Sequence, residues 1–255
     1  MNTELSDDQL LRYSRQIMLP QFGVEAQQKL SQAHAVIIGI GGLGSPAALY
    51  LAAAGIGRLT LVDDDEVEIS NLQRQVIHRT DTLGEKKVDS ARTQLAALNP
   101  YVKVDTVAER LTEAAMKKLL REVDCVLDAT DNFDSRFLIN KACVEQNTPL
   151  VSAAAIRFEG QLSVFDPRDE TSPCYACLYP QSGEENTTCS ENGILAPVVG
   201  MLGCMQALET IKLLCQLGET LTGQLQLFDA LTMQWRTLKL KKDPNCPVCG
   251  AGNKT

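Results

Sequence analysis

The stretch that most constrains this chain is residues 34–65, HAVIIGIGGLGSPAALYLAAAGIGRLTLVDDD. Its apolar, β-branched start at 35–38 predicts a buried parallel strand, and the small-residue run at 45–54 predicts a helix. The turn between them holds Gly39, Gly41, Gly42 and Gly44. A second strand at 58–62 ends in Asp63, where a ribose hydroxyl would need an acceptor. These are the parts of a nucleotide-binding βαβ unit, in which glycines and a helix N-terminus face phosphates. A dehydrogenase would show the same pattern, and a glycine turn can also serve tight packing alone.

The rest of the chain extends this unit into a Rossmann-like α/β fold. Further strands are predicted at 102–107, 123–127 and 150–154, and the helices are predicted at 7–18, 84–98, 112–120, 133–146 and 194–214. This alternation predicts a mostly parallel sheet with helices on both faces. Runs at 161–165, 225–228 and 234–240 predict antiparallel strands that complete the sheet. We expect a single domain over 1–255, with a nucleotide-binding half (1–165) and a half that holds a crossover loop, a metal site and the partner-binding surface (166–255).

Composition excludes some classes of function. The formal net charge of −8 argues against a nucleic-acid-binding protein. The acidic start, MNTELSDDQ, is no signal peptide, and the uncharged run at 194–208 is short for a membrane span. Nine cysteines, an odd number, without an export signal indicate a reducing compartment, so we expect a cytoplasmic protein that contacts no membrane.

Several polar residues are expected to gather at the carboxyl edge of the sheet, where open α/β sheets bind ligands. The segment SNLQRQ at 70–75 follows one strand, and Asp131 follows another. Lys86 and Lys87 fall in the first turn of a predicted helix, where a cation is unfavourable unless an anion shares the site. The alternative is a tolerated surface lysine. Arg12 and Arg15 share a face of the first helix, a spacing that by itself is more typical of solvated arginines.

The cysteines fall into three groups. The pairs Cys174-x-x-Cys177 and Cys246-x-x-Cys249 predict a structural zinc site of four thiolates, with free thiols or a redox pair as the alternatives. Four cysteines within predicted strands and helices are expected to be small core residues: Cys125, Cys143, Cys204 and Cys215. Cys189 lies in a polar loop before a helix, where it could carry sulfur or form an adduct. The alternative is an incidental loop thiol.

Taken together, these residues resemble a known family. The motifs are RYSRQI, GIGGLG, Asp63, SNLQRQ, GEKKVDSAR, DATDN, PCYACL and CPVCG. They are similar to those of the ubiquitin-activating-like ThiF/MoeB/HesA family of ATP-dependent enzymes, which activate ubiquitin-like proteins. The resemblance covers nearly the whole chain and is closest to the MoeB type, the adenylyltransferases of the molybdopterin-synthase sulfur carrier.

The resemblance implies roles for individual residues. Gly41, Gly42 and Gly44 would approach the ATP phosphates, Asp63 would hold the ribose, and Asp65 would help to position the nucleotide. The other implied nucleotide contacts are Ser70, Asn71, Leu72, Gln73, Arg74, Lys87, Asp131 and Asn132. Asp131 matches an acid linked to Mg²⁺. Arg15 matches an arginine that reaches the ATP of the other subunit, which implies a homodimer. The four paired cysteines, Cys174, Cys177, Cys246 and Cys249, match structural zinc ligands.

The implied reaction is adenylation of the C-terminal Gly-Gly carboxylate of a ubiquitin-like sulfur carrier of the MoaD type, with release of pyrophosphate, for molybdenum cofactor biosynthesis. A C-terminal carboxyl has a pKa of about 3.5 and is already an anion, so no general base is needed. Arg15, Arg74, Lys87 and Mg²⁺ would neutralise charge and align the attack, and Asp131 would be the acid linked to Mg²⁺. A separate sulfurtransferase would act downstream.

Other interpretations remain open. The segments AAIRFEGQLSVFDPR and SPCYACLY are similar to the MoeB type, whereas QLQLFDALTMQWRTLKL, with Trp235, favours the ThiF type, which adenylates ThiS for thiamine thiazole synthesis. An NAD-dependent oxidoreductase would explain the glycines and Asp63 but has no use for Arg74, Lys87 and Asp131 together. A non-catalytic scaffold for a ubiquitin-like protein is disfavoured by the intact set of charged residues.

Overall fold

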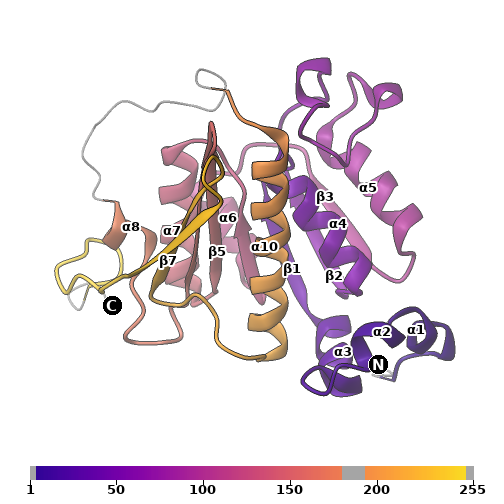
Figure 1. Cartoon of the computed structure of the whole chain (residues 1–255), viewed down its shortest axis with the longest axis horizontal. Coiled ribbons are helices and arrows are strands. Elements are labelled where there is room, and N and C mark those ends of the chain that lie inside the picture. Colours follow the sequence, from indigo (N-terminus) through magenta and orange to yellow (C-terminus); the bar gives the residue numbers. More distant parts are fainter. Residues whose placement is uncertain (1–3, 180–192, 251–255) are drawn as a thin grey trace.

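The computed structural model of the chain describes residues 4–179 and 193–250. Its centre is an eight-stranded sheet in the order β3-β2-β1-β4-β5-β6-β7-β8 (Figure 1). The strands are β1 (His34–Ile38), β2 (Arg58–Val62), β3 (Lys103–Val107), β4 (Cys125–Asp128), β5 (Leu150–Ile156), β6 (Glu159–Phe165), β7 (Gln224–Asp229) and β8 (Gln234–Lys239). Strands β1 to β5 pair in parallel and β6 to β8 are antiparallel. The predicted fold class is therefore confirmed.

The register of the sheet determines where the loops meet. β1 pairs with β2 on one side and with β4 on the other, and Ile38 stands level with both Val62 and Asp128. The chain builds outward from β1 to β3 and then returns to place β4 on the opposite side. Loops that follow β1 and β4 therefore diverge at the same edge, which is the position where doubly wound sheets leave a crevice.

Helices cover both faces of the sheet. They are α1 (Asp7–Arg12), α2 (Ser14–Ile17), α3 (Gly23–Gln32), α4 (Gly44–Ala54), α5 (Lys87–Leu98), α6 (Glu113–Leu120), α7 (Phe133–Gln146), α8 (Tyr175–Leu178) and α10 (Ala196–Cys215). Alternate residues of β1 enter two cores, because successive side chains of a strand point to opposite faces. Ala35 and Ile37 pack with α3, α4, α5 and α10, whereas Val36 and Ile38 pack with α6 and α7.

α10 is the longest helix of the described residues and lies across the sheet beside α4 (Figure 1). Its length and hydropathy would suffice to cross a membrane, but 56% of its apolar window is buried inside the protein. Gln206 is fully buried, and its Nε2 donates to the carbonyls of Asp128 (2.8 Å) and Val151 (3.1 Å). α10 is thus a core helix that also fixes the ends of β4 and the start of β5.

The N-terminal segment differs from its prediction. The single helix expected over 7–18 begins at the Ser6 capping box but is divided into α1 and α2 at Tyr13. Tyr13 turns inward, where its ring lies against Gly55 and its hydroxyl accepts a hydrogen bond from Asn99 Nδ2 at 2.8 Å. α3 was not predicted from the sequence. That helix is mostly polar and buries only Ala26, Gln27 and Leu30, so few apolar residues mark it.

Candidate active site and four-cysteine cluster

A cavity of about 590 Å³ opens at the edge of the sheet where β1, β2 and β4 end. Most of the residues predicted to bind nucleotide line it: Gly41, Gly42, Asp63, Asp65, Ser70, Asn71, Arg74, Lys87, Asp131 and Asn132. These residues come from four separate segments of the chain, and the sheet topology brings them together. The cavity therefore lies at the crevice that the strand order creates.

Four predicted residues do not line this cavity: Arg15, Gly44, Leu72 and Gln73. Leu72 and Gln73 follow the short 3₁₀ turn Ile69–Asn71, and Gln73 is exposed. Arg15 is exposed on α2, and its neighbour Gln16 donates from Nε2 to the carbonyl of Ala54 at 2.8 Å. Ala54 ends α4 and the glycine turn begins it, so Arg15 lies near the far end of that helix from the cavity of its own chain.

The glycines of the turn have different surroundings. A Cβ at Gly44 would lie 1.9 Å from the carbonyl oxygen of Gly39, so only glycine allows the backbone to close there. A Cβ at Gly42 would lie 2.9 Å from Val199 Cγ2 of α10. A Cβ at Gly41 would meet only Gln75 Nε2 at 3.6 Å, an ordinary contact. Gly41 thus faces the cavity without a packing reason to be glycine.

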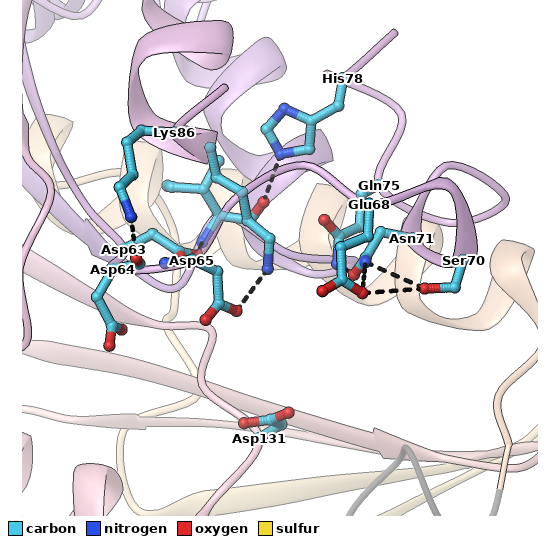
Figure 2. Close-up of polar contacts among 12 residues, drawn as sticks. Asp63, Asp64, Asp65, Glu68, Ser70, Asn71, Gln75, His78, Lys86 and Asp131 are labelled. Atoms are coloured by element: carbon cyan, nitrogen blue, oxygen red, sulfur yellow. Dashed lines mark hydrogen bonds and ion pairs between the residues drawn. The ribbon is translucent and has the colours of Figure 1, made fainter. Parts of the chain in front are cut away.

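Asp63 and Lys87 are charged residues that line the cavity, and Figure 2 shows Asp63 beside Asp65. Asp63 accepts hydrogen bonds from the backbone N–H of Ile40 (2.6 Å) and of Asp65 (3.0 Å). Burial raises the pKa of Asp63, and the charge of Lys87 offsets part of that rise. Lys87 is the first residue of α5 and only 5% exposed, and its Nζ lies 2.7 Å from Asp65 Oδ2. The anion that compensates this buried lysine is therefore already present in the protein.

A second group of polar residues holds the segment after β2 in place. Gln75 Nε2 donates to Asn71 Oδ1 at 2.6 Å, and Asn71 Nδ2 donates to Glu68 Oε2 at 3.3 Å. His78 Nε2 lies 3.0 Å from the carbonyl of Ile40 in the glycine turn. Because a carbonyl can only accept, Nε2 carries a hydrogen, and burial lowers the pKa of His78.

Glu68, Gln75 and His78 were not predicted from the sequence to be site residues. Glu68 and Gln75 line the cavity, and His78 supports it through Ile40. The i,i+4 spacing of Asn71 and Gln75 was the available signal for a helical turn that joins their side chains. The contact between His78 and the glycine turn spans residues far apart in the chain, so local sequence gave no signal for it.

The two acidic residues of the DATDN motif are placed in opposite environments. Asp128 is fully buried, and its carboxylate accepts hydrogen bonds from Thr130 N (3.1 Å), Thr130 Oγ1 (2.7 Å) and Ser152 Oγ (3.0 Å). Asp131 is exposed at the cavity, and Figure 2 shows it apart from the cluster around Asp63 and Asn71. Asn132 caps α7 by accepting from Ser135 N at 2.9 Å. Asp128 thus fixes the loop, while Asp131 faces the cavity.

A second cavity of about 440 Å³ adjoins the first and is lined mainly by the strands β5 to β8. The two cavities share the lining residues Asp131, Arg136 and Ala155. The polar cavity at the parallel strands and the cavity at the antiparallel part of the sheet therefore adjoin at these three residues.

The four paired cysteines form one cluster, as their spacing predicts. Their sulfur atoms all lie within 4.8 Å of one another, with Cys174–Cys246 at 3.6 Å and Cys177–Cys249 at 3.4 Å. Four thiolates around a zinc ion at about 2.3 Å would be separated by about 3.8 Å, so the donor set and its spacing fit a tetrahedral site. Such a site would join α8, after β6, to the C-terminal turn that follows β8.

Every cysteine among the described residues is free of a disulfide bond, the four of the cluster included. Cys125, Cys143 and Cys215 are buried, as predicted, whereas Cys204 is only half-buried on α10. Burial raises the pKa of Cys125 to about 12 and that of Cys215 to about 11, which suits small core residues. Cys189 lies outside the described residues.

The doubly wound sheet, the glycine turn and the polar cavity at its switch point define the class as Rossmann-like α/β proteins with a ligand site at the carboxyl edge. Within this class, the chain belongs to the ThiF family, whose family model matches residues 13–248.

Three relatives describe the similarity further. The chain is 47% identical to a molybdopterin-synthase adenylyltransferase of Salmonella typhimurium, over 97% of this chain and 99% of the relative. It is also 47% identical to a sulfur carrier protein ThiS adenylyltransferase of Escherichia coli, over 98% of each chain. The adenylyltransferase and sulfurtransferase MOCS3 of Sus scrofa is 48% identical over 96% of this chain but only 54% of its own length.

Solved structures give the same fold at lower identity. The E. coli enzyme MccB with ATP is 27% identical, with a TM-score of 0.80 over 94% of this chain and 74% of MccB. The microcin C7 biosynthetic enzyme MccB in complex with N-formylated MccA has a TM-score of 0.83 at 26% identity, over 94% of this chain and 75% of MccB.

Proposed function

We propose that this protein is an adenylyltransferase that uses ATP to activate the C-terminal Gly-Gly carboxylate of a MoaD-type sulfur carrier for molybdenum cofactor biosynthesis. The observation that carries the proposal is the 47% identity to a molybdopterin-synthase adenylyltransferase over almost the full length of both chains. The polar cavity at the carboxyl edge supports it, because the residues expected to contact nucleotide line that cavity.

The placement of ATP follows from the charges around the cavity. The phosphates lie along the glycine turn at Gly41 and Gly42, with Arg74 and Lys87 beside them. Asp63 accepts from the ribose, since its carboxylate is held at the end of β2 by two backbone N–H groups. Asp65 keeps Lys87 in place through their 2.7 Å ion pair.

The reaction joins two anions, so charge neutralisation is its main requirement. A carboxylate oxygen of the carrier attacks the α-phosphorus, a new O–P bond forms, and the bond from the α-phosphorus to the bridging oxygen breaks with release of pyrophosphate. The terminal carboxyl, with a pKa of about 3.5, arrives already ionised, so no residue has to remove a proton. Arg74 and Lys87 offset the charge that develops on the phosphates.

Carboxylate oxygens suit Mg²⁺, and two groups of acids border the cavity. We assign Asp131 to hold the ion because its side chain is exposed. The carboxylate of Asp128 is buried and already accepts hydrogen bonds from Thr130 and Ser152. Bound Mg²⁺ would supply positive charge to the phosphate oxygens.

We further propose a homodimer in which Arg15 serves the cavity of the other subunit. Arg15 is anchored near the opposite end of α4 from the glycine turn, so it is poorly placed to reach the cavity of its own chain. The exposed apolar side chain of Leu208 on α10 is consistent with a subunit contact. A mixture of an Arg15→Ala variant and an Asp131→Ala variant should regain activity, because the mixed dimer contains one intact composite site.

The carrier would dock on the half formed by residues 166–255, and its tail would reach Asp131 through the second cavity. Zinc held by Cys174, Cys177, Cys246 and Cys249 would stabilise that half. We place the protein in the cytoplasm, where a separate sulfurtransferase would convert the acyl-adenylate.

The test is ATP–pyrophosphate exchange with Mg²⁺ and purified MoaD-type or ThiS-type carrier in separate reactions. Exchange that requires the MoaD-type Gly-Gly end and disappears in Asp131→Ala supports the proposal. Exchange with the ThiS-type carrier alone would replace it with thiamine thiazole synthesis, a second candidate because the ThiS adenylyltransferase is equally identical at 47%. No exchange with either carrier would contradict both candidates, and carrier binding without turnover would indicate a scaffold.

A further inference from the structure

Arg136 occupies an unusual position for a cation. It belongs to the first turn of α7 (Phe133–Gln146), where the positive end of the helix dipole disfavours a positive side chain. It is only 9% exposed, although arginine is rarely buried without a charged partner. Such a residue needs a compensating anion.

The described part of the chain does not supply that anion directly. Within residues 4–179 and 193–250, Arg136 has no carboxylate at ion-pair distance, and its buried Nε has no hydrogen-bond partner. One guanidinium nitrogen donates to the carbonyl of Thr130 at 2.7 Å, and the group lies 5.9 Å from the centre of the Phe133 ring. Burial works to lower the pKa of Arg136, but the charge of Asp128 works against burial and the pKa is raised overall. Asp128 forms no ion pair with Arg136, however, and its carboxylate oxygens already accept from Thr130 and Ser152.

Arg136 also lies where the two cavities meet. It lines both the nucleotide cavity and the second cavity, together with Asp131 and Ala155. The hydrogen bond to Thr130 ties it to the residue directly before Asp131. Arg74 and Lys87 line the nucleotide cavity but not the second cavity. The second cavity is lined by two arginines, the exposed Arg236 of β8 and the buried Arg136, and of these two only Arg136 also lines the nucleotide cavity.

We propose that Arg136 binds the terminal carboxylate of the carrier tail at the junction of the two cavities and presents it to the α-phosphate beside Asp131. This inference rests on the proposed function, because it takes the carrier carboxylate as the nucleophile. A guanidinium matches the planar geometry of a carboxylate, and a charge-assisted hydrogen bond in a desolvated site is strong. The same contact would give the buried guanidinium of Arg136 an anionic partner and would position the carrier carboxylate for attack.

The test compares two forms of a MoaD-type carrier, one with a free C-terminal carboxylate and one with a C-terminal amide. Their binding to the full chain is measured by calorimetry with Mg²⁺ and an ATP analogue whose α–β bridge cannot be cleaved. Wild type should bind the amide about 10–100-fold more weakly, the loss expected for one charged hydrogen bond. Arg136→Gln should bind both forms within about twofold of each other, because the group that distinguishes them is gone.

Two further variants keep the test decisive. Arg136→Lys retains the positive charge but lacks the planar guanidinium that can donate two hydrogen bonds to one carboxylate, so its preference for the carboxylate form should be reduced. This variant gives a result even if Arg136→Gln does not fold. Arg121→Gln removes an exposed arginine outside both cavities and should keep the full preference. Affinity for the ATP analogue should stay within about threefold of wild type in every variant, since Arg74 and Lys87 hold the phosphates.

The outcomes separate this inference from the proposed function. If wild type binds the carrier and Arg136→Gln still prefers the carboxylate by the wild-type factor, Arg136 is not the receiving group and the proposed function stands. If wild type binds the carboxylate and amide forms of the carrier equally, Arg136 is likewise not the receiving group, and the proposed function stands. If wild type binds no carrier and catalyses no pyrophosphate exchange, both the inference and the proposed function fail.

Discussion

The four-cysteine cluster takes its side chains from two short turns, whereas the nucleotide cavity takes its side chains from loops that follow several strands. In the cluster, three pairs of sulfur atoms lie 3.4 to 4.0 Å apart, and Cys174 and Cys177 also accept hydrogen bonds from Asn140 Nδ2 and Asp243 N. In the cavity, Asp63, Lys87 and Asn71 are already paired within the protein. The thiols of the cluster thus face one another, as the donors of a metal site would, whereas the side chains of the cavity are held in place by one another.

This difference predicts that the two regions fail in different ways. The largest effect is expected for Cys246→Ser, which removes a proposed zinc ligand that is 3% exposed and lies 3.6 Å from the sulfur of Cys174. The free energy of unfolding should fall by roughly 4 kcal/mol or more, as for loss of a structural metal, and a chelator should have a similar effect on wild type. Thermal and denaturant unfolding measure it, and elemental analysis measures the bound zinc.

The control is Cys204→Ser, which changes a half-buried free thiol outside the cluster and should cost less than about 1 kcal/mol. Equal melting temperatures for Cys246→Ser, Cys204→Ser and wild type would show that the cluster carries no structural metal.

Asp131→Asn should have the opposite signature. Pyrophosphate exchange should fall by about 10²–10³-fold because an exposed charge at the cavity is lost, while the melting temperature stays near that of wild type. Asp128→Asn is the matched variant, since it places an amide among donors that now point at a buried carboxylate. It should cost about 1–3 kcal/mol of stability. A melting temperature that drops more for Asp131→Asn than for Asp128→Asn would reverse the assignment of the two acids.

Within the glycine turn, substitutions at Gly41 and Gly44 are also expected to have different effects. Gly41→Ala should leave stability within about 0.5 kcal/mol of wild type, because its Cβ meets only an ordinary contact at 3.6 Å. It should raise the KM for ATP about tenfold if phosphates pass close to this backbone. Gly44→Ala should instead destabilise the protein by about 2 kcal/mol, because its Cβ would lie 1.9 Å from Gly39 O. An unchanged KM in Gly41→Ala would move the phosphates away from the turn.

The smallest expected effect is on how the free energy of unfolding depends on pH. Burial lowers the pKa of His78 in the folded state, so the unfolded chain takes up this proton at a higher pH than the folded chain does. The contribution of the neutral ring to stability is therefore present above the unfolded pKa of about 6.5 and is lost as pH falls below it. His78→Gln should make the stability curve between pH 7 and 5 shallower, by at most about 1.4 kcal/mol per pH unit, the slope for one proton. Chemical unfolding at several pH values measures the slope, and an unchanged slope would contradict the assignment.

Much of this architecture could be predicted because the relevant signals are local. Residues 35–38 and 58–62 flank a glycine turn, and that order alone indicates a βαβ unit. The position of Asp131 followed from its place after a strand, and the spacing of the cysteine pairs indicated their cluster.

The rest depends on contacts between distant segments. Nothing local separates Asp128 from Asp131, because their difference is burial by Ser152 and α10. His78 meets Ile40 only after the sheet has formed, and Tyr13 divides the first helix because it packs against Gly55. The proposed role of Arg136 could not be predicted, because it depends on two cavities that are lined by residues from both halves of the chain.

The close approach of Val199 on α10 to Gly42 also limits how this protein can evolve. Position 42 can accept a side chain only if position 199 becomes smaller, since a Cβ at 42 would lie 2.9 Å from Val199 Cγ2. In an alignment of relatives, a residue larger than glycine at 42 should therefore occur together with glycine or alanine at 199. Position 42 lines the nucleotide cavity and also packs against α10. Its substitutions should therefore covary with those at position 199.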